Sequence, residues 1–299
     1  MPALVWINGV IHPPEAAMIS VFDHGLLYGD GVFEGMRTYD GKVFRLKSHL
    51  KRLFDSAKAI ALEIPLEFDE LVGITDALVE QSGFSDAYLR HVVTRGVGDL
   101  GIDPRRCRTP SVIIICDELK MFPPERLAAG LRVVTAGTPM PHRESLSPRV
   151  KSLNYLPHVL AKHEGGTAGA DEVLMLDSSG HVAEGSGQNL FVVTDGVLRT
   201  PPPSAGILKG ITRDVVIELA TAEGVMVREE LLNRYDVYTA DEVFLTGTAS
   251  EIVPVREVDA RPIGLGCPGA LTERLMAAFQ ALVRGGGDET GVAGDGAKG

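Results

Sequence analysis

Hydrophobic positions along the chain recur with two spacings, which together predict alternating strands and helices. Residues 46–60 place apolar side chains every three or four positions, which is typical of a helix with one buried side. Similar runs predict helices at 69–81, with Asp69 as the N-cap, at about 207–223 and at 269–284. Short apolar or alternating runs predict strands at 32–39, 87–95, 111–116, 131–136, 172–176, 181–184, 190–194, 225–228, 242–246 and 251–255.

Glycine residues mark the predicted turns. Asn8-Gly9 predicts a hairpin within residues 4–22, and Asp40-Gly41 and Asp195-Gly196 predict two more. Between residues 25 and 35, four of eleven positions are glycine, which indicates a backbone that turns sharply or is approached closely.

The middle of the chain holds a lysine, Lys151, between an extended run and a predicted helix. We expect Asn154 to cap this helix and Pro157 to lie in its first turn, where a missing N–H costs little. A lysine at such a junction can present its amine to a pocket, and partial burial would lower its pKa. The helix is expected to carry its apolar side at Leu156, Val159 and Leu160 and to end at Gly165-Gly166.

Composition limits the classes of protein and the domain organisation. The chain has 299 residues, 44% of them hydrophobic and 23% charged, which is ordinary for a globular protein with a sizeable core. A net charge of −11 without a basic cluster argues against nucleic acid and anionic membranes as partners. Three cysteines without a metal-ligand or CxxC spacing suit a reducing cytoplasm. We predict a small N-terminal α/β domain at 1–118, a linker at 119–130, a larger domain at 131–284 and a disordered glycine-rich tail at 285–299.

Four features besides Lys151 are candidates for a site. Glu184 ends a predicted strand before Gly-Ser-Gly, and Arg52 flanks the first long helix. The segments 210–212 and 247–249 each offer backbone N–H groups to an anion. A lysine amine, a carboxylate and phosphate donors are the groups that pyridoxal 5′-phosphate (PLP) requires. The chain lacks a GxxxxGK[ST] and a GxSxG motif, so nucleotide and serine-hydrolase sites are poorly supported, and no metal site is expected.

Five motifs then follow one another along the chain. They are Tyr28–Gly35 (YGDGVFEG), Lys151–Tyr155 (KSLNY), Glu184–Phe191 (EGSGQNLF), Gly210–Asp214 (GITRD) and Asp241–Pro254 (DEVFLTGTASEIVP). As a set they closely resemble the class IV (fold-type IV) PLP-dependent aminotransferases, and the branched-chain amino acid aminotransferases in particular. The resemblance covers about residues 4–283. It implies a two-domain α/β fold whose larger domain has a β-barrel-like core with surrounding helices.

The resemblance also implies roles for individual residues. Lys151 would bond covalently to PLP and move the substrate proton, and Glu184 would pair with the pyridine nitrogen. The other implied cofactor residues are Arg52, Tyr155, Leu208, Ile211, Thr212, Gly247 and Thr248. The implied substrate residues are Tyr28, Phe33, Arg37, Tyr88, Arg90, Thr248 and Ala249, together with a loop at Leu100, Gly101 and Ile102 that resembles one donated by a partner subunit.

The expected activity is reversible transfer of an amino group from L-leucine, L-isoleucine or L-valine to 2-oxoglutarate by a homodimer or a higher homo-oligomer. The same fold leaves open a D-amino acid aminotransferase, an (R)-amine transaminase and an aminodeoxychorismate lyase. The first of these captures the α-carboxylate with an Arg-x-His pair that is missing from the loop at 96–102, and the complete Phe33–Tyr39 run disfavours the other two. A non-catalytic ligand-binding protein is the alternative outside this class, and it would keep its ligand without Lys151.

Overall fold

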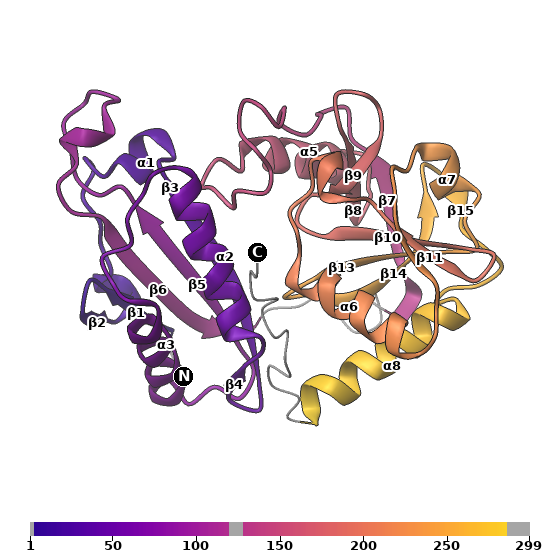
Figure 1. The fold of residues 1–299 in the computed structure, drawn as a ribbon, viewed down its shortest axis with the longest axis horizontal. Helices are drawn as coiled ribbons and strands as arrows, with labels where there is room; N and C mark the ends of the chain where they lie inside the picture. The colour runs from indigo at the N-terminus through magenta and orange to yellow at the C-terminus, as the bar shows by residue number, and fades with distance from the viewer. Residues whose placement is uncertain (1–2, 120–127, 286–299) are drawn as a thin grey trace, which may run out of the picture.

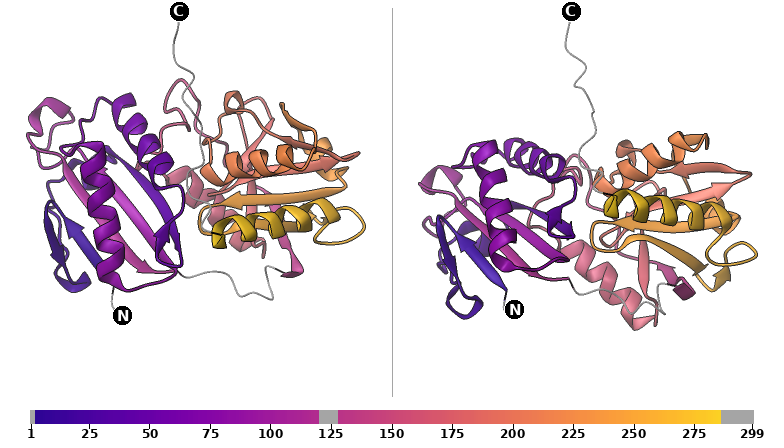
Figure 2. Two further views of the ribbon diagram at one scale, coloured as in Figure 1. Left: turned by 60° about the horizontal axis from the view of Figure 1, so that its bottom comes forward. Right: turned by 90° about the horizontal axis from the view of Figure 1, so that it is seen from below.

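The computed structural model describes residues 3–119 and 128–285. Two bodies of sheet and helix lie side by side, with the N-terminal elements on one side and the C-terminal elements on the other (Figures 1 and 2). Most of the predicted linker and nearly all of the predicted tail fall outside the described residues, so the domain boundaries stay a prediction. Within the described part, no helix is long and apolar enough to cross a membrane.

The N-terminal body is an antiparallel sheet with two helices on one face. Among the described residues, six strands pair in the order β2-β1-β6-β5-β3-β4. Leu50 and Leu53 of one helix and Leu71 of the other are fully buried against Leu89 and Ile114 of the sheet. The elements are β1 (Leu4–Ile7), β2 (Val10–His12), α1 (His24–Tyr28), β3 (Gly31–Tyr39), β4 (Lys42–Val43), α2 (Leu46–Ala59), α3 (Phe68–Ser82), β5 (Ala87–Thr94) and β6 (Ser111–Glu118).

The C-terminal body is built on a closed barrel. In the described part of the chain, β10, β13, β14, β7, β8 and β9 pair in succession, and a Glu184–Asn189 pairing between β9 and β10 closes the ring. The predicted barrel-like core is therefore confirmed. The elements are β7 (Leu131–Thr135), α5 (Leu156–Thr167), β8 (Glu172–Leu176), β9 (Val182–Gly185), β10 (Asn189–Thr194), β11 (Val197–Thr200), α6 (Ile211–Ala222), β12 (Val227–Glu229), α7 (Arg234–Tyr238), β13 (Glu242–Gly247), β14 (Glu251–Val258), β15 (Arg261–Pro262) and α8 (Ala270–Arg284).

Apolar side chains fill both surfaces of the barrel wall. Leu190, Val243 and Val253 belong to one buried cluster. Phe191 and Phe244 alternate with them along the strands and face the opposite way, toward the helices α6 and α8. Their rings stack with centroids 5.0 Å apart. This period-two arrangement lets the same strands bury both faces.

Two predicted helix caps are wrong. The helix α3 starts earlier than expected, because Glu67 is its N-cap and forms a reciprocal capping box with Glu70 instead of Asp69 serving that role. The N-cap of α5 is Tyr155, without a side-chain cap. Asn154 instead donates a hydrogen bond across to the Gly29 carbonyl at 3.0 Å, because the chain after α1 runs beside the Lys151 segment. The helix α5 also continues past Gly165-Gly166 to Thr167.

The apolar side of α5 does not face the core of its own chain. The exposed fractions are 66% for Leu156, 59% for Val159 and 48% for Leu160. Ala161 and Gly165 are the buried residues of this helix instead, and they pack toward the strand β8. The spacing of the apolar residues predicted a helix correctly, but it did not identify the buried face.

The Asn154 contact generates a prediction about stability. Replacing Asn154 with alanine should lower the free energy of unfolding by about 0.5–1 kcal/mol, the value of one exposed neutral hydrogen bond. Asn154→Ser should lose the same amount, because serine can cap a helix but cannot reach Gly29. Urea unfolding followed by circular dichroism measures both variants. Recovery of stability in the serine variant would show that Asn154 acts as a cap.

Candidate active site

Lys151 lies where the two bodies meet, and its backbone is held by the edge of the N-terminal sheet. The Phe33 amide of β3 donates to the Lys151 carbonyl at 2.9 Å, and the Leu153 amide donates to the Gly31 carbonyl at 3.0 Å. The Lys151 amide itself donates to the Ser56 hydroxyl of α2 at 3.2 Å. The segment therefore behaves as a short additional strand, which fixes the direction of the lysine side chain.

The Lys151 amine is enclosed by aromatic groups. Its Nζ lies 4.8 Å from the centre of the Phe33 ring and 3.4 Å from the Tyr155 hydroxyl. Burial and the nearby Arg52 charge lower the pKa of Lys151 to about 8, which brings the neutral, nucleophilic amine into the physiological range. Burial, helped by the charge of Glu184, raises the pKa of Tyr155, so its hydroxyl stays protonated.

Glu184 lies at the seam where the barrel closes. Its Oε2 accepts hydrogen bonds from the Asn189 amide group and from the Leu208 backbone N–H, each at 3.0 Å. The Asn189 amide group also donates to the Leu208 carbonyl at 2.8 Å. Burial raises the pKa of Glu184 to about 8, although the Leu208 N–H opposes the shift. A cationic group or an N–H donor placed beside this carboxyl group would lower its pKa again and favour the carboxylate form.

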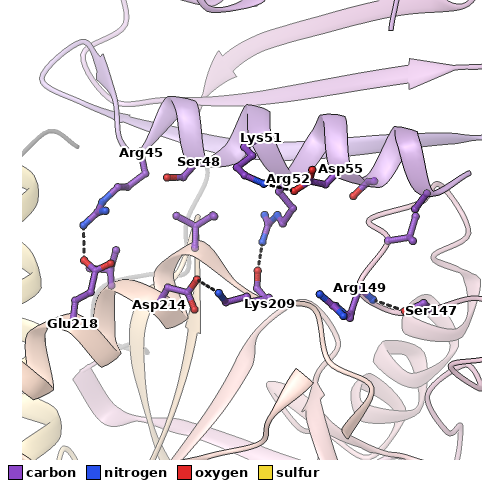
Figure 3. Close-up of a pocket in the computed structure, with 15 residues that line it drawn as sticks. Arg45, Ser48, Lys51, Arg52, Asp55, Ser147, Arg149, Lys209, Asp214 and Glu218 are labelled. Carbon is purple, nitrogen blue, oxygen red and sulfur yellow. Dashed lines mark hydrogen bonds and ion pairs between the residues drawn. The ribbon is translucent and has the colours of Figure 1, made fainter. Parts of the chain in front are cut away.

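Donors for an anion gather at the start of α6. Gly210 is the N-cap of this helix and brings no side chain to the end of it, so the first amides, at Ile211 and Thr212, are left to a ligand within the described residues. Arg52 reaches the same place from α2, and its Nη1 donates to the Lys209 carbonyl at 2.8 Å. In Figure 3 this bond crosses the cavity between the two helices.

A cavity of about 440 Å³ joins the lysine to the predicted substrate residues. One wall comes from the turn between β13 and β14, and another comes from β3 and β5. A Cβ atom at Gly35 would lie only 2.1 Å from the Tyr88 hydroxyl, so glycine leaves the room that this tyrosine occupies. The lining includes Gly35, Tyr88, Lys151, Gly247, Thr248 and Ala249.

Arg90 and Arg37 of the N-terminal sheet approach this cavity in different ways. The Arg90 guanidinium lies 4.6 Å from the centre of the Phe33 ring and donates to the Tyr88 hydroxyl at 3.1 Å. Arg37 instead braces the turn, since its Nη1 donates to the Ala249 carbonyl at 3.3 Å and pairs with Glu251 at 2.8 Å. Within the chain, Arg90 is the better placed of the two to meet a substrate side chain.

The loop at residues 100–102 is not in the lining of the Lys151 cavity. The Tyr28 hydroxyl donates to the Leu100 carbonyl, which ties this loop to α1. Leu100 and Ile102 are 69% and 82% exposed. A role for Tyr28, Leu100, Gly101 and Ile102 in the site therefore stays a prediction.

Sequence reasoning missed several residues that hold the site together. Asn189 orients Glu184, and Glu34 accepts two hydrogen bonds from Arg52. Gln188 and Ser250 lie in different motifs and bond to each other at 3.0 Å. One sequence signal could have identified four of these residues, because they lie within the five motifs: Glu34, Gln188, Asn189 and Ser250. Only the contacts in space show what they do.

Comparison with known proteins decides the family. The family model described as amino-transferase class IV matches residues 31–258. This chain belongs to the class IV aminotransferases. Its five motifs all lie within or at the edge of the matched range, so the recognition from sequence is confirmed.

Relatives of this class IV aminotransferase carry a common name. The branched-chain-amino-acid aminotransferase of Pseudomonas aeruginosa is 39% identical over 287 residues, which cover 94% of this chain and 93% of that one. A Methanocaldococcus jannaschii protein, to which the same activity is assigned provisionally, is 51% identical over 278 residues, covering 93% and 96%.

Solved structures agree with the fold. The branched-chain amino acid aminotransferase of Escherichia coli superimposes with a TM-score of 0.93 at 36% identity and covers 98% of both chains. The branched-chain amino acid aminotransferase of Thermobaculum terrenum, solved in its PLP-bound form, gives a TM-score of 0.86 at 33% identity and covers 95% of this chain and 94% of that one.

The lowered pKa of Lys151 can be tested by chemical labelling. The rate at which acetic anhydride acylates Lys151 should rise with pH and level off above about pH 8, because the neutral amine reacts and burial favours it. Peptide mass spectrometry after brief labelling across pH 6–11 measures the rate, with a short lysine peptide as the reference. A profile for Lys151 that keeps rising toward about 10.4, as for a solvated lysine, would contradict this environment.

Proposed function

We propose that this protein transfers the amino group of L-leucine, L-isoleucine or L-valine reversibly to 2-oxoglutarate, with PLP as its cofactor. One observation carries the proposal: Lys151, an amine of lowered pKa, lines a cavity with Tyr88 and the Thr248-Ala249 turn, and the Arg52 guanidinium and the buried Glu184 lie close enough to shift its pKa. The names of the relatives and the PLP bound in a solved neighbour support the same activity.

The residues fit PLP in several respects. When bound, the cofactor withdraws electrons from the bond between the substrate Cα and its hydrogen. Glu184 would face the pyridine nitrogen, where an N–H partner would favour its charged form. Tyr155 keeps a proton to donate near the ring oxygen, and Lys151 supplies the amine that bonds to the cofactor and moves the substrate proton.

The phosphate would lie at the start of α6. The amides at Ile211 and Thr212, the positive end of the helix dipole and the Arg52 guanidinium converge there, and this combination suits a phosphate dianion. Thr248, on the turn after β13, would complete the site from the barrel side. Leu208 would pack on the ring face, since its backbone already contacts Glu184.

Substrate selection would follow from the mixed walls of the cavity. The Tyr88 hydroxyl and the N–H groups at Thr248 and Ala249 would receive the α-carboxylate. Phe33 would contact an aliphatic side chain, and Arg90, stacked on the Phe33 ring, would meet the distal carboxylate of glutamate. One pocket can then accept both partners of the reaction, because the arginine is held at the edge of an apolar surface.

The activity can be tested in one series of experiments. With added PLP the purified protein should absorb visible light, and borohydride should bleach it and leave a reduced cofactor on Lys151. Lys151→Ala should lower the transamination rate of L-leucine by more than about 100-fold, the usual contribution of a proton-transferring group. Steady-state rates with 2-oxoglutarate should favour L-leucine over D-alanine. A preference for D-alanine would support the D-amino acid aminotransferase instead, and a colourless protein would overturn the proposal.

We further propose a homodimer in the cytoplasm. Two exposed apolar surfaces support the dimer: the α5 stripe (Leu156, Val159 and Leu160) and the surface of α1 and the neighbouring loop (Leu26, Leu27, Leu100 and Ile102). A second copy that covers them would also bring its own 100–102 loop to the site.

Free thiols at Cys107, Cys116 and Cys267 support the cytoplasm, a reducing compartment, as the location of the protein.

Light scattering after gel filtration tests the dimer. The unchanged protein should have twice the 32.0 kDa mass of one chain, and Val159→Glu should shift it toward the monomer, because a charge in an apolar interface is poorly solvated. Met226→Glu is the matched control, since Met226 is also exposed but lies outside both surfaces. A monomeric unchanged protein would contradict the dimer.

A further inference from the structure

A buried carboxylate lies behind the phosphate site, and the proposed chemistry does not use it. Glu34 lies in the middle of β3 and is fully buried. Side chains on a strand alternate between its faces. Phe33, Gly35 and Arg37 therefore face the substrate cavity and its turn, whereas Glu34 faces α2 on the opposite side.

Glu34 binds Arg52 through a two-point fork. The Arg52 Nε donates to Oε1 at 2.6 Å, and its Nη2 donates to Oε2 at 2.9 Å. His49 Nδ1 lies 2.9 Å from the same Oε2. Burial by itself raises the pKa of Glu34, but the Arg52 charge and His49 outweigh it and hold the pKa well below its usual range. The Glu34 carboxylate is therefore charged, and side chains from two successive turns of α2 hold it in place.

The fork determines which side of Arg52 remains available. A guanidinium has five N–H groups. Within the described residues, Glu34 takes two of them and the Lys209 carbonyl takes one, so two are left for a ligand. Lys209 immediately precedes Gly210, the N-cap of α6. In Figure 3 the Arg52 side chain extends from α2 across a cavity of about 610 Å³ toward this point.

We propose that Glu34 is a positioning residue for the cofactor phosphate: it holds the Arg52 guanidinium in the orientation that faces the start of α6. The inference rests on the phosphate role of Arg52 proposed above. A flexible arginine would have to be ordered when the phosphate binds, whereas the fork orders it beforehand.

Orientation and charge predict opposite effects of removing the carboxylate. The negative charge of Glu34 partly cancels the positive charge of Arg52, so it also weakens the attraction between Arg52 and a phosphate. If long-range attraction dominated, a neutral residue at this position would strengthen binding. If orientation dominates, as we infer from the fork, the same change weakens binding, because the remaining N–H groups are no longer aimed at the ligand.

The test compares PLP with pyridoxal, which lacks the phosphate. Absorbance titration of the apoprotein should give a Kd for PLP that is about tenfold higher in Glu34→Gln, comparable to the loss of one charge-assisted hydrogen bond. The Kd for pyridoxal should change little. The gain in thermal midpoint on PLP addition should shrink in this variant as well. His49→Gln is the matched control, since it changes the other partner of Glu34 but keeps the fork. Its Kd for PLP should stay within about threefold, because glutamine still offers an N–H donor to the carboxylate.

Several results would overturn the inference. They are tighter PLP binding by Glu34→Gln, equal weakening for PLP and pyridoxal, and an effect of His49→Gln as large as that of Glu34→Gln. If Glu34→Gln fails to fold, Glu34→Asp replaces it, because aspartate keeps the charge but is one methylene too short for the fork; it should also weaken PLP binding selectively, and an unchanged Kd would contradict the role of the fork.

Arg52→Gln separates this inference from the proposed phosphate site. If Arg52→Gln binds PLP as tightly as the unchanged protein, the phosphate role of Arg52 is wrong. If Arg52→Gln weakens PLP binding but Glu34→Gln does not, only the role of Glu34 is wrong.

Discussion

The contact between β3 and the Lys151 segment is the constraint on which the site depends. Backbone hydrogen bonds join Phe33 to Lys151 and Gly31 to Leu153. These bonds fix the position of the reactive lysine relative to the strand β3 of the N-terminal sheet. Because a backbone pairing fixes the direction of successive side chains, the Lys151 amine is directed to the Phe33 ring and the Tyr155 hydroxyl. The same strand carries Gly35 toward the cavity and Glu34 toward Arg52, so one register places groups for three parts of the site.

Two buried glutamates show how local partners assign different states to the same side chain. Glu34 meets an arginine in a fork, and its pKa falls although burial opposes this. Glu184 meets an amide side chain and one backbone N–H, and burial raises its pKa to about 8. The first therefore remains an anion that orients its neighbour. The second is sensitive to whatever cationic or N–H group enters the cavity, which suits a residue facing a ligand.

The sequence predicted most helices and strands, but it predicted the wrong N-cap residues for two helices. The strands and the long helices lie near their predicted ranges, since hydrophobic periodicity reports local conformation directly. Asn154 and Asp69 were assigned as caps because their types favour that position, yet Tyr155 and Glu67 take it. The Asn154 side chain instead donates a hydrogen bond to the carbonyl of Gly29, which lies 125 positions away in the chain. The apolar side of α5 was predicted at Leu156, Val159 and Leu160, and Leu156 and Val159 are exposed in the structure, because periodicity identifies an apolar side without saying what covers it.

The sequence by itself determined the residue types that could perform the chemistry and, through the order of five motifs, the family. It named Lys151, Glu184 and Arg52, and the structure brings them to the boundary between the two bodies. Only the tertiary structure decided the pKa of each group, the closure of the barrel at Glu184 and Asn189, and the fork between Glu34 and Arg52. The physical reason is that burial and charge pairing depend on distances between segments far apart in the chain, and local sequence patterns carry no information about those distances.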